Sequence, residues 1–564
     1  MKWIQRTPKV KPSKNDTVIE QIAKIRGIQD PDRFLNPTAE ELHDPYLMKN
    51  IEEASNRIIK AIGDKERIVV SYDPDADGMT SATIMLRYLK NYTDNVDYIY
   101  GERNDGHGIA EMLKVSELNE EKHADRIAHN KANTDKIREA DLVILIDSSS
   151  NDADACKFIR EKLNTEIIIL DHHAIERDNP HVLMVNPQQE GDEYPNKQLS
   201  GAGVVFKVLQ VMEDTLDSVD VWQYIDLVAV GMYADIMRVD GLENRYLIMQ
   251  GLRNIKNAGL ARILKGGKVN TYNGIKGDAI GFTIAPLLNG VARMDDIKLG
   301  IDILMEDDDK VCMKLRLKMF KLNELRKEKQ KKIVEQYLKN VDSSKKVLIV
   351  TDEQSSKGFN GIVAQQLSDK YKRPVIVGRI HKGTLSGSFR SYNNFKFKKF
   401  LQAFDGEIEA LGHEGAGGIV ISVDELDNLE TYFQRHMPSL EDTEPTVVYD
   451  LEFDVSEVND YLRDVEKFNL LAGSGFPRVI VRINGITVDE AECIGATRET
   501  VKINTFDDMG LIKFRVDDQY ASELSTFDMI EAVGNLAMNE FYNFGLKQMV
   551  RTPQLMIEDY KVSE

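Results

Sequence analysis

Short apolar runs alternate with amphipathic segments along the first half of the chain. The runs at residues 68–70, 143–146 and 167–170 are each compact enough to form a buried strand. Strands that alternate with helical segments are typical of an α/β domain with a mainly parallel sheet, and we predict such a domain here. Residues 1–60 precede it with a helical pattern broken by prolines, and we expect this segment to pack on the α/β domain.

A long polar helix is predicted near the middle of the chain. Residues 308–340 contain neither Gly nor Pro, and apolar side chains recur at Val311, Leu315, Leu322 and Leu325. An uninterrupted pattern of this length is long for a helix inside a globular domain. We therefore expect it to connect two separate bodies.

A second α/β unit is predicted after this helix. Strand-like runs at 347–350 and 374–378 flank a helical segment at 361–371. The sequences SGSFRS at 386–391 and GHEGAGG at 412–418 are rich in Gly and Ser, and they are interpreted as polar loops.

The last 120 or so residues change to a period of two, which is typical of strands. Asn484-Gly485 within this region favours a hairpin, and residues 456–470 are expected to form a helical insertion. The pattern predicts a small β-barrel or sandwich. The chain is thus divided into five expected segments, which are 1–60 (N-terminal), 61–305 (first α/β domain), 306–342 (connecting helix), 343–440 (second α/β unit) and 441–564 (β domain).

The composition is that of an ordinary soluble globular protein. The chain has 564 residues, 42% apolar and 29% charged, and its three cysteines lie far apart without a CxxC spacing. A disulfide framework or a cysteine zinc site is therefore not indicated. No export signal or run of about 20 apolar residues is present, so we expect a cytoplasmic protein without a membrane span.

Charge is distributed unevenly along the chain. The net charge of −20 argues at first against a nucleic-acid partner. Residues 309–346, however, carry 13 Lys or Arg against five acids, and residues 369–400 carry nine against one. Residues 441–564 carry 11 basic against 25 acidic side chains. The basic middle of the chain fits a polyanionic substrate. For residues 309–346 alone, a solvated helix face is the alternative. The acidic C-terminal region suggests a basic protein partner rather than nucleic acid.

Acids and histidines follow the three predicted strands. Because loops at the carboxyl ends of parallel strands meet at one edge of the sheet, we expect these groups to converge. Oxygen donors mixed with imidazoles suit a hydrated divalent metal better than a structural zinc. The metal-ligand candidates are Asp73, Asp75, Asp77, Asp147, His172, His173 and Asp235.

Simpler interpretations exist for each cluster alone. DPDADG at 73–78 could be a surface turn or a loose calcium loop, and His172 and His173 could be solvated histidines after a strand. An EF-hand is excluded because the chain after Gly78 becomes an apolar helix without the required Glu. Three strand ends that supply ligands of one kind favour the metal site.

The sequence resembles the DHH phosphoesterase superfamily, and within it the RecJ group of exonucleases. The resemblance includes DPDADGMTSATIML, the DHH triplet at 171–173, LSGAGVVFKVLQ, ADIMRVDGLENR and IGFTIAPLLNGVARM. GFNGIVAQQL, GSFRS and ALGHEGAGG resemble the DHH-associated domain, and the C-terminal residues resemble the end of an OB-fold domain. The resemblance therefore implies a DHH domain, a connecting helix, a DHH-associated domain and an OB-like barrel.

The resemblance also implies a function and its residues. It implies a single-stranded-DNA-specific 5′-to-3′ exonuclease of DNA repair, recombination or replication, which releases 5′-mononucleotides with two Mn²⁺ ions or with Mg²⁺ as a substitute. Asp73, Asp75, Asp77, Asp147, His172 and Asp235 would bind the metals, with Asp147 shared, and His173 and Asp171 would be catalytic. Substrate contacts are expected from Arg103, His107, Arg293, Ser388, Arg390 and His413.

Other functions remain open at this point. A DHH phosphodiesterase for short oligonucleotides or cyclic dinucleotides is one alternative, and a catalytically weak DNA-binding scaffold is another. Expected partners are single-stranded DNA with a 5′ end and a single-strand-binding protein or helicase, and the resemblance suggests a monomer. The altered loops SGSFRS, LGH at 411–413 and LAGSGFP at 471–477 indicate a divergent member, compatible with a phage or mobile-element relative.

Overall fold

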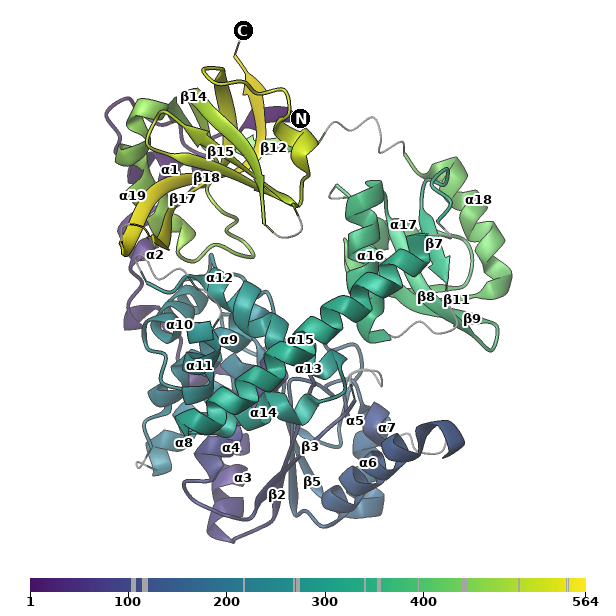
Figure 1. Cartoon of the computed structure of the whole chain (residues 1–564). Coiled ribbons are helices and arrows are strands. Elements are labelled where there is room, and N and C mark those ends of the chain that lie inside the picture. Colours follow the sequence, from purple (N-terminus) through teal and green to yellow (C-terminus); the bar gives the residue numbers. More distant parts are fainter. Residues whose placement is uncertain are drawn as a thin grey trace.

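In its described residues, the computed structural model contains four β-sheets, and one long helix connects the parts built on two of them (Figure 1). It describes residues 1–102, 108–113, 120–216, 219–266, 269, 274–338, 341–351, 357–393, 395–438, 445–495, 498–543, 545 and 547–563. Among these residues, no helix is both long and apolar enough to cross a membrane.

The first body is built on a five-stranded sheet in the order β3-β2-β4-β5-β6. All its neighbouring strands are parallel, which confirms the predicted α/β domain with a parallel sheet. The strands are β2 (Ile68–Tyr72), β3 (Val96–Tyr100), β4 (Leu142–Ile146), β5 (Glu166–Leu170) and β6 (Leu183–Val185).

Helices cover both faces of this sheet. Alternate residues of β2 are therefore buried on opposite faces. Ile68 and Val70 belong to one buried cluster, and Val69 belongs to another. A strand buried on both faces needs apolar residues throughout, which is what the continuous runs IVV and LVILI provide. One cluster includes helices α3 (Ile51–Gly63), α4 (Ala76–Leu89), α8 (Gly201–Leu216), α9 (Ile225–Ala234) and α10 (Leu242–Arg253); the other includes α5 (Ile109–Leu113), α6 (Glu120–Arg138), α7 (Ala153–Phe158) and η3 (Ile159–Leu163).

Further helices extend the first body toward the connecting helix. They are η4 (Val221–Tyr224), α11 (Ala258–Gly266), α12 (Gly277–Ala279), η5 (Ile280–Ile284), α13 (Ala285–Arg293) and α14 (Ile297–Met305). The predicted long helix is α15 (Asp309–Leu338), and it runs from the first body to the second (Figure 1). Its buried residues Cys312, Met319, Asn323 and Tyr337 form a narrow contact line, so most of its polar side chains face solvent.

The second body contains a five-stranded sheet in the order β10-β11-β9-β8-β7, in which only β7 and β8 are parallel. Its strands are β7 (Leu348–Thr351), β8 (Val375–His381), β9 (Thr384–Arg390), β10 (Ile408–His413) and β11 (Ala416–Ser422). Its helices are α16 (Lys357–Tyr371), α17 (Phe397–Gln402), η6 (Val423–Glu425) and α18 (Leu426–His436).

The prediction that SGSFRS and GHEGAGG are loops was wrong. Residues 386–390 of the first sequence lie in β9, and the second sequence runs from the end of β10 through a turn at 414–415 into β11. Glycine has a packing role in this sheet, because a Cβ on Gly387 would lie 2.3 Å from the Val377 carbonyl oxygen and 2.7 Å from the Gly378 Cα. The small residues that suggested a loop are those that let two strands approach closely.

The C-terminal body is a closed β-barrel. Strands β14 (Val481–Ile494), β15 (Thr500–Thr505), β16 (Gly510–Phe514), β18 (Gln548–Val562) and β17 (Met529–Asn543) pair in that order, and β17 pairs back to β14. This ring agrees with the predicted OB-like barrel. Strands β12 (Thr446–Tyr449) and β13 (Leu451–Asp454), helix α19 (Val458–Asn469) and the short helices η7 (Val455–Glu457) and η8 (Asp518–Ala521) complete it.

The hairpin predicted at Asn484-Gly485 was wrong. Both residues lie inside β14, where the register with β17 shifts between Ile483 and Ile486 and Gly485 has a φ of 73°. The pair therefore forms a bulge, which lets one long strand bend and pair with different neighbours along its length.

The N-terminal segment contacts the barrel as well as the first body. Strand β1 (Lys2–Gln5) pairs in parallel with β12, although their residues are about 440 positions apart in sequence. The buried carboxylate of Asp450 accepts hydrogen bonds from Arg6 and, in bidentate form, from Arg26. The remaining elements of the segment are α1 (Val18–Arg26), α2 (Pro31–Leu35), η1 (Ala39–Glu41) and η2 (Pro45–Leu47).

One buried arginine joins three parts of the chain. Arg245 of α10 donates hydrogen bonds to the carbonyl oxygens of Phe34, Val239 and Leu471, and its guanidinium lies 3.9 Å from the centre of the Phe34 ring. Burial lowers its pKa to about 9. The N-terminal segment, the first body and the entry to the barrel are thus held by one side chain.

Replacing Arg245 with Met should destabilise this junction. The substitution leaves three buried carbonyl oxygens without their donor, and we expect the free energy of unfolding to fall by about 3 kcal/mol or more. Urea unfolding followed by circular dichroism measures the change. Arg253→Met, in the exposed last turn of the same helix, is the control, and equal stability of the two variants would contradict this role.

Candidate metal centre

The carboxyl ends of three adjacent strands place acids in one row. Tyr72, Ile146 and Leu170 are paired across β2, β4 and β5. The next residue on each strand is an acid, namely Asp73, Asp147 and Asp171. The convergence expected from the sequence therefore occurs at the carboxyl edge of the sheet.

Asp147 turns the chain sharply at the end of β4. Its backbone adopts the left-handed region with a φ of 60°, and its N–H donates to the Leu170 carbonyl oxygen at 2.9 Å. Asp tolerates this region better than most residues, at some cost in strain. The conformation directs a side chain that is only 3% exposed toward the neighbouring strand ends.

Asp77 is held by the amino end of α8. Its carboxylate accepts hydrogen bonds from the Ser200 hydroxyl (2.9 Å) and from the backbone N–H groups of Gly201 (2.7 Å) and Ala202 (3.1 Å). Asp75 caps α4 by accepting from the N–H groups of Asp77 and Gly78. The loop 73–78 is thereby fixed from both sides.

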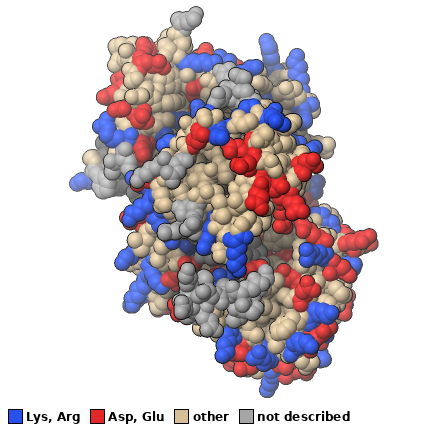
Figure 2. Space-filling view, turned by 90° about the vertical axis from the view of Figure 1, so that its right-hand side faces the viewer, with Lys and Arg blue, Asp and Glu red and all other residues tan. Residues whose placement is uncertain are grey.

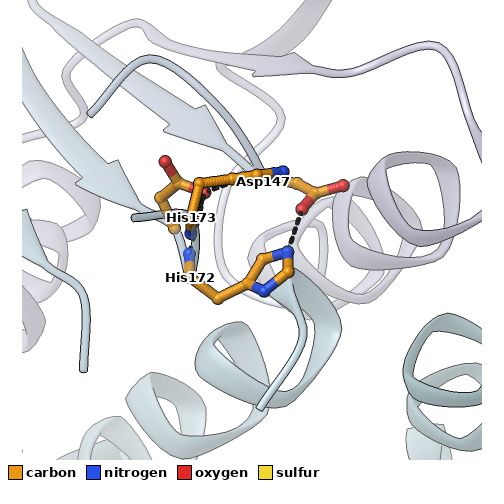
Figure 3. A group of neighbouring side chains, drawn as sticks. Asp147, His172 and His173 are labelled. Atoms are coloured by element: carbon orange, nitrogen blue, oxygen red, sulfur yellow. Dashed lines mark hydrogen bonds and ion pairs between the residues drawn. The ribbon is translucent and has the colours of Figure 1, made fainter. Parts of the chain in front are cut away.

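A histidine and three acids form the centre of the cluster. His172 Nε2 lies 3.1 Å from Asp147 Oδ1, 3.3 Å from Asp235 Oδ2 and 3.9 Å from Asp77 Oδ2, and Figure 3 shows His172 and Asp147 pointing toward one another. Asp235 is delivered by the C-terminal end of α9. One ligand atom from each of Asp77, His172 and Asp235 lies within 4.8 Å of the others, as do atoms of the group Asp147, Asp171, His172 and His173.

The protonation of this cluster reflects an excess of buried negative charge. Burial and the charges of Asp77 and Asp75 raise the pKa of Asp147 well above its usual range and that of Asp235 to about 8. Burial and the charge of His173 lower the pKa of His172, which favours the neutral imidazole that metals bind.

These donors fit a divalent cation. His172 Nε2 and Asp147 Oδ1 are buried and, apart from their 3.1 Å ion-pair approach to each other, have no hydrogen-bond partner within the described part of the chain. Buried polar atoms normally have a partner, and a cation among carboxylate and imidazole donors would satisfy both atoms. We conclude that this is a candidate metal site.

Asp171 and His173 form a separate pair beside the cluster. Asp171 is fully buried and accepts hydrogen bonds from His173 Nδ1 (2.7 Å) and the Ser150 hydroxyl (2.7 Å). Burial opposes ionisation of both groups, but their mutual hydrogen bond and charges outweigh it, lowering the pKa of Asp171 and raising that of His173 to about 9. The hydrogen bond to Asp171 therefore orients the His173 ring and favours its protonated form.

Two glycines missed in the sequence analysis make room for the ligands. A Cβ on Gly201 would lie 2.7 Å from the Asp147 Cβ, and one on Gly231 would lie 2.3 Å from Asp77 Oδ1. Ser200, which donates to Asp77, was also missed. The small residues of LSGAG at the start of an apolar helix were the available signal.

A cavity of about 420 Å³ lies next to this cluster. Ala234 and Ile236, the neighbours of Asp235, line it. Its other walls come from α13 (Asn289 and Arg293), α15 (Arg326), α16 and residues 473–474 before the barrel. The cavity thus lies where all three bodies and the connecting helix meet.

The expected substrate-binding residues are placed in different ways. Arg293 lines the cavity and donates to the Gly358 carbonyl oxygen at the start of α16. Arg390 lies beside the same helix, α16. A Cβ on Gly361 of this helix would lie 2.6 Å from Nη2 of Arg390. Ser388 lies on β9 opposite Gly418, and the backbone of His413 pairs with Ala416, which pairs with Arg390. Arg103, His107 and the side chain of His413 lie outside the described residues.

Comparisons with known proteins agree with this architecture. Residues 67–232 match the DHH family, N-terminal domain. The chain is 28% identical to the single-stranded-DNA-specific exonuclease RecJ of Bacillus subtilis, over 94% of this chain and 66% of that protein. It is also 28% identical to the SPβ prophage-derived YorK protein of B. subtilis, named as a single-strand DNA-specific exonuclease, over 96% of this chain and 95% of YorK.

A solved structure extends the similarity to the fold. RecJ of Thermus thermophilus in complex with Mn²⁺ matches with a TM-score of 0.77 at 21% identity, covering 100% of this chain and 80% of that one. The chain spans about two thirds of B. subtilis RecJ and nearly all of YorK. It is a divergent RecJ-like protein that carries a DHH domain.

Cation binding should stabilise the protein, and more strongly at higher pH. A carboxyl group with a raised pKa stabilises the folded state while it is protonated, and this contribution is lost as the pH rises toward about 8, the value for Asp235. Without a cation we therefore expect a lower melting temperature at about pH 7.5 than at about pH 6, and a larger gain on adding Mn²⁺ at the higher pH. Thermal melts with and without Mn²⁺ at the two pH values measure these melting temperatures. Asp235→Asn should reduce the increase caused by Mn²⁺. No increase at either pH would rule out the site.

Gly231→Ala should weaken metal binding. The new methyl group displaces the Asp77 carboxylate, and we expect roughly a tenfold or greater loss of Mn²⁺ affinity. Titration calorimetry measures the affinity, and circular dichroism checks the fold. Gly241→Ala is the control, because a Cβ there meets no atom within 4 Å; an equal loss in both variants would contradict the argument.

Proposed function

We propose that this protein is a single-stranded-DNA-specific exonuclease that hydrolyses phosphodiester bonds in the 5′-to-3′ direction and releases 5′-mononucleotides. The observation that carries the proposal is the acid–histidine cluster at the sheet edge, which opens beside a cavity lined by two arginines. Similarity to RecJ proteins over most of the chain supports a metal-dependent nuclease.

The metal ligands are proposed as two overlapping sets. Asp77, Asp147, His172 and Asp235 would hold one ion, and Asp73, Asp75 and Asp147 the other. When bound, two divalent ions supply Lewis acidity and a polarised water for in-line displacement at phosphorus. Mn²⁺ suits carboxylate and imidazole donors better than Mg²⁺, because imidazole is a softer ligand.

His173 is proposed to act on the substrate itself. Its cationic ring lies beside the ligands, and its centre is 4.4 Å from that of His172. A positive charge at this place would stabilise the charge that develops on the phosphate in the transition state. Asp171 has no exposed surface, so we propose a positioning role for it through the hydrogen bond to His173 Nδ1.

The strand is proposed to enter through the cavity. Arg293 and Arg326 line it from the first body and the connecting helix, and Arg390 approaches α16 from the second sheet. Guanidinium groups bind phosphate oxygens in bidentate geometry, so this group of arginines is suited to a 5′-phosphate. Ser388 and His413, on the same sheet as Arg390, would contact the terminal nucleotide.

Substrate selectivity is proposed to come from shape rather than from overall charge. Figure 2 shows that Lys and Arg side chains are scattered over the face it presents, while acidic side chains gather in its right-hand half. A protein with a net charge of −20 therefore needs local cations, such as those at the cavity. A site at the meeting point of three bodies would admit a single strand and exclude a duplex.

End-labelled DNA tests this function. We expect Mn²⁺-dependent release of mononucleotides from the 5′ end of single-stranded DNA, little attack on duplex, and no reaction with chelator. Asp77→Asn should reduce the rate roughly 100-fold or more. Loss of a direct metal ligand should lower activity at least as much as loss of a residue that orients a ligand. Asp154→Asn, an exposed acid on α7, should leave the rate unchanged.

Each part of the proposal has a contrary outcome. Release from the 3′ end would exclude the polarity, and equal digestion of duplex would exclude the selectivity. Full activity of Asp77→Asn would exclude the metal centre. Activity confined to cyclic dinucleotides or dinucleotide products would favour a small-substrate phosphodiesterase instead.

A further inference from the structure

Two stacked phenylalanines are exposed on the barrel. The rings of Phe506 and Phe527 lie with centres 5.1 Å apart and planes inclined by 3°. Their exposed fractions are 52% and 72%, far from those of core residues. Exposed aromatic side chains lower the solubility of a protein. An exposed aromatic pair therefore indicates an interaction site.

The backbone holds both rings in place. The N–H groups of Phe506 and Phe527 donate to the carbonyl oxygens of Thr487 (3.0 Å) and Val488 (2.8 Å) on β14. Phe527 has a φ of 75°, a left-handed conformation that a bulky residue rarely adopts. A strained residue that presents its ring to solvent indicates a selected arrangement rather than a loose loop.

One further apolar side chain extends this surface. Met529 pairs with Thr487 and is 52% exposed, and its carbonyl oxygen accepts from the Ser563 N–H. We call Phe506, Phe527 and Met529 the phenylalanine surface.

The phenylalanine surface has an acidic rim. The segments that carry or flank it, residues 484–495, 503–512 and 521–530, contain no Lys or Arg. They contain seven acids, which are Asp489, Glu490, Glu492, Asp507, Asp508, Glu523 and Asp528. Five of these side chains are well exposed, Asp507 and Asp528 are half-buried, and Glu492 forms an ion pair at 3.7 Å with Lys502, which lies just outside these segments. A DNA strand would be repelled here, because every nucleotide brings a phosphate charge.

We infer that the phenylalanine surface binds a protein segment in which Lys or Arg residues flank an aromatic or aliphatic anchor. The anchor would pack on the stacked rings, and the cations would meet the acidic rim and the ring faces. Charge complementarity selects this partner over nucleic acid. The site is separate from the metal centre and does not depend on the proposed nuclease activity.

A short peptide of alternating Arg and Trp probes this site on the full-length chain. We expect the fluorescein-labelled peptide to bind in a salt-sensitive way by fluorescence anisotropy, and a peptide of alternating Glu and Trp to bind at least tenfold more weakly. Phe527→Ser should reduce affinity for the basic peptide at least tenfold. Phe527→Gly should do the same, and it keeps the backbone because glycine accepts a positive φ.

Two controls separate the phenylalanine surface from general effects. Phe514→Ser removes a ring that is 54% exposed at the far end of the β15–β16 ladder, opposite Thr500, and should not change binding. Asp489→Lys, in the rim, should weaken binding of the basic peptide.

Several outcomes would overturn the inference. Unchanged peptide affinity in both Phe527 variants would exclude this surface, and equal loss in Phe514→Ser would exclude its specificity. Binding of an oligothymidylate that is lost in Phe527→Ser would make it a base-stacking surface. Concentration-dependent dimers of the native chain that disappear in Phe527→Ser would make it a self-association surface.

Discussion

Repulsion among buried carboxylates is the constraint around which the first body is arranged. The acids at 73, 75, 77, 147 and 235 act on one another strongly enough to raise the pKa of Asp147 and Asp235, with burial as the larger cause. Charges buried in this way are stable only when they are neutralised. A bound divalent cation satisfies the constraint, whereas the cation-free cluster must take up protons.

The surrounding structure serves to hold these charges together. A parallel sheet aligns three strand ends in one row, and the amino end of α8 supplies N–H groups that favour a negative Asp77. Gly201 and Gly231 leave space for two carboxylates that a methyl group would displace. Outside this centre, Arg245 and Asp450 tie the N-terminal segment to the barrel, which keeps the walls of the adjacent cavity together.

Most of the fold was predictable because its signals are local. Continuous apolar runs predicted the parallel strands, and the long segment without Gly or Pro predicted α15. The acids that directly follow the strands could be placed together, since parallel topology aligns strand ends. Two local signals misled: Asn484-Gly485 forms a bulge because β14 is long enough to pair with several strands, and the glycines of SGSFRS serve close strand packing.

Contacts between distant segments could not be predicted from the sequence. Nothing near β1 indicates β12 as its partner, and nothing near Asp77 indicates that Ser200 and Gly201 would hold it. The role of Asp171 also depended on structure, since a DHH triplet alone does not distinguish the acid that orients His173 from an acid that contacts substrate.

The most direct test of the metal centre is anomalous X-ray diffraction from crystals grown with Mn²⁺. The account predicts two anomalous peaks about 3.5 to 4 Å apart, with Asp147 between them and His172 beside one. A cluster without a peak, or with manganese bound elsewhere in the chain, would contradict it.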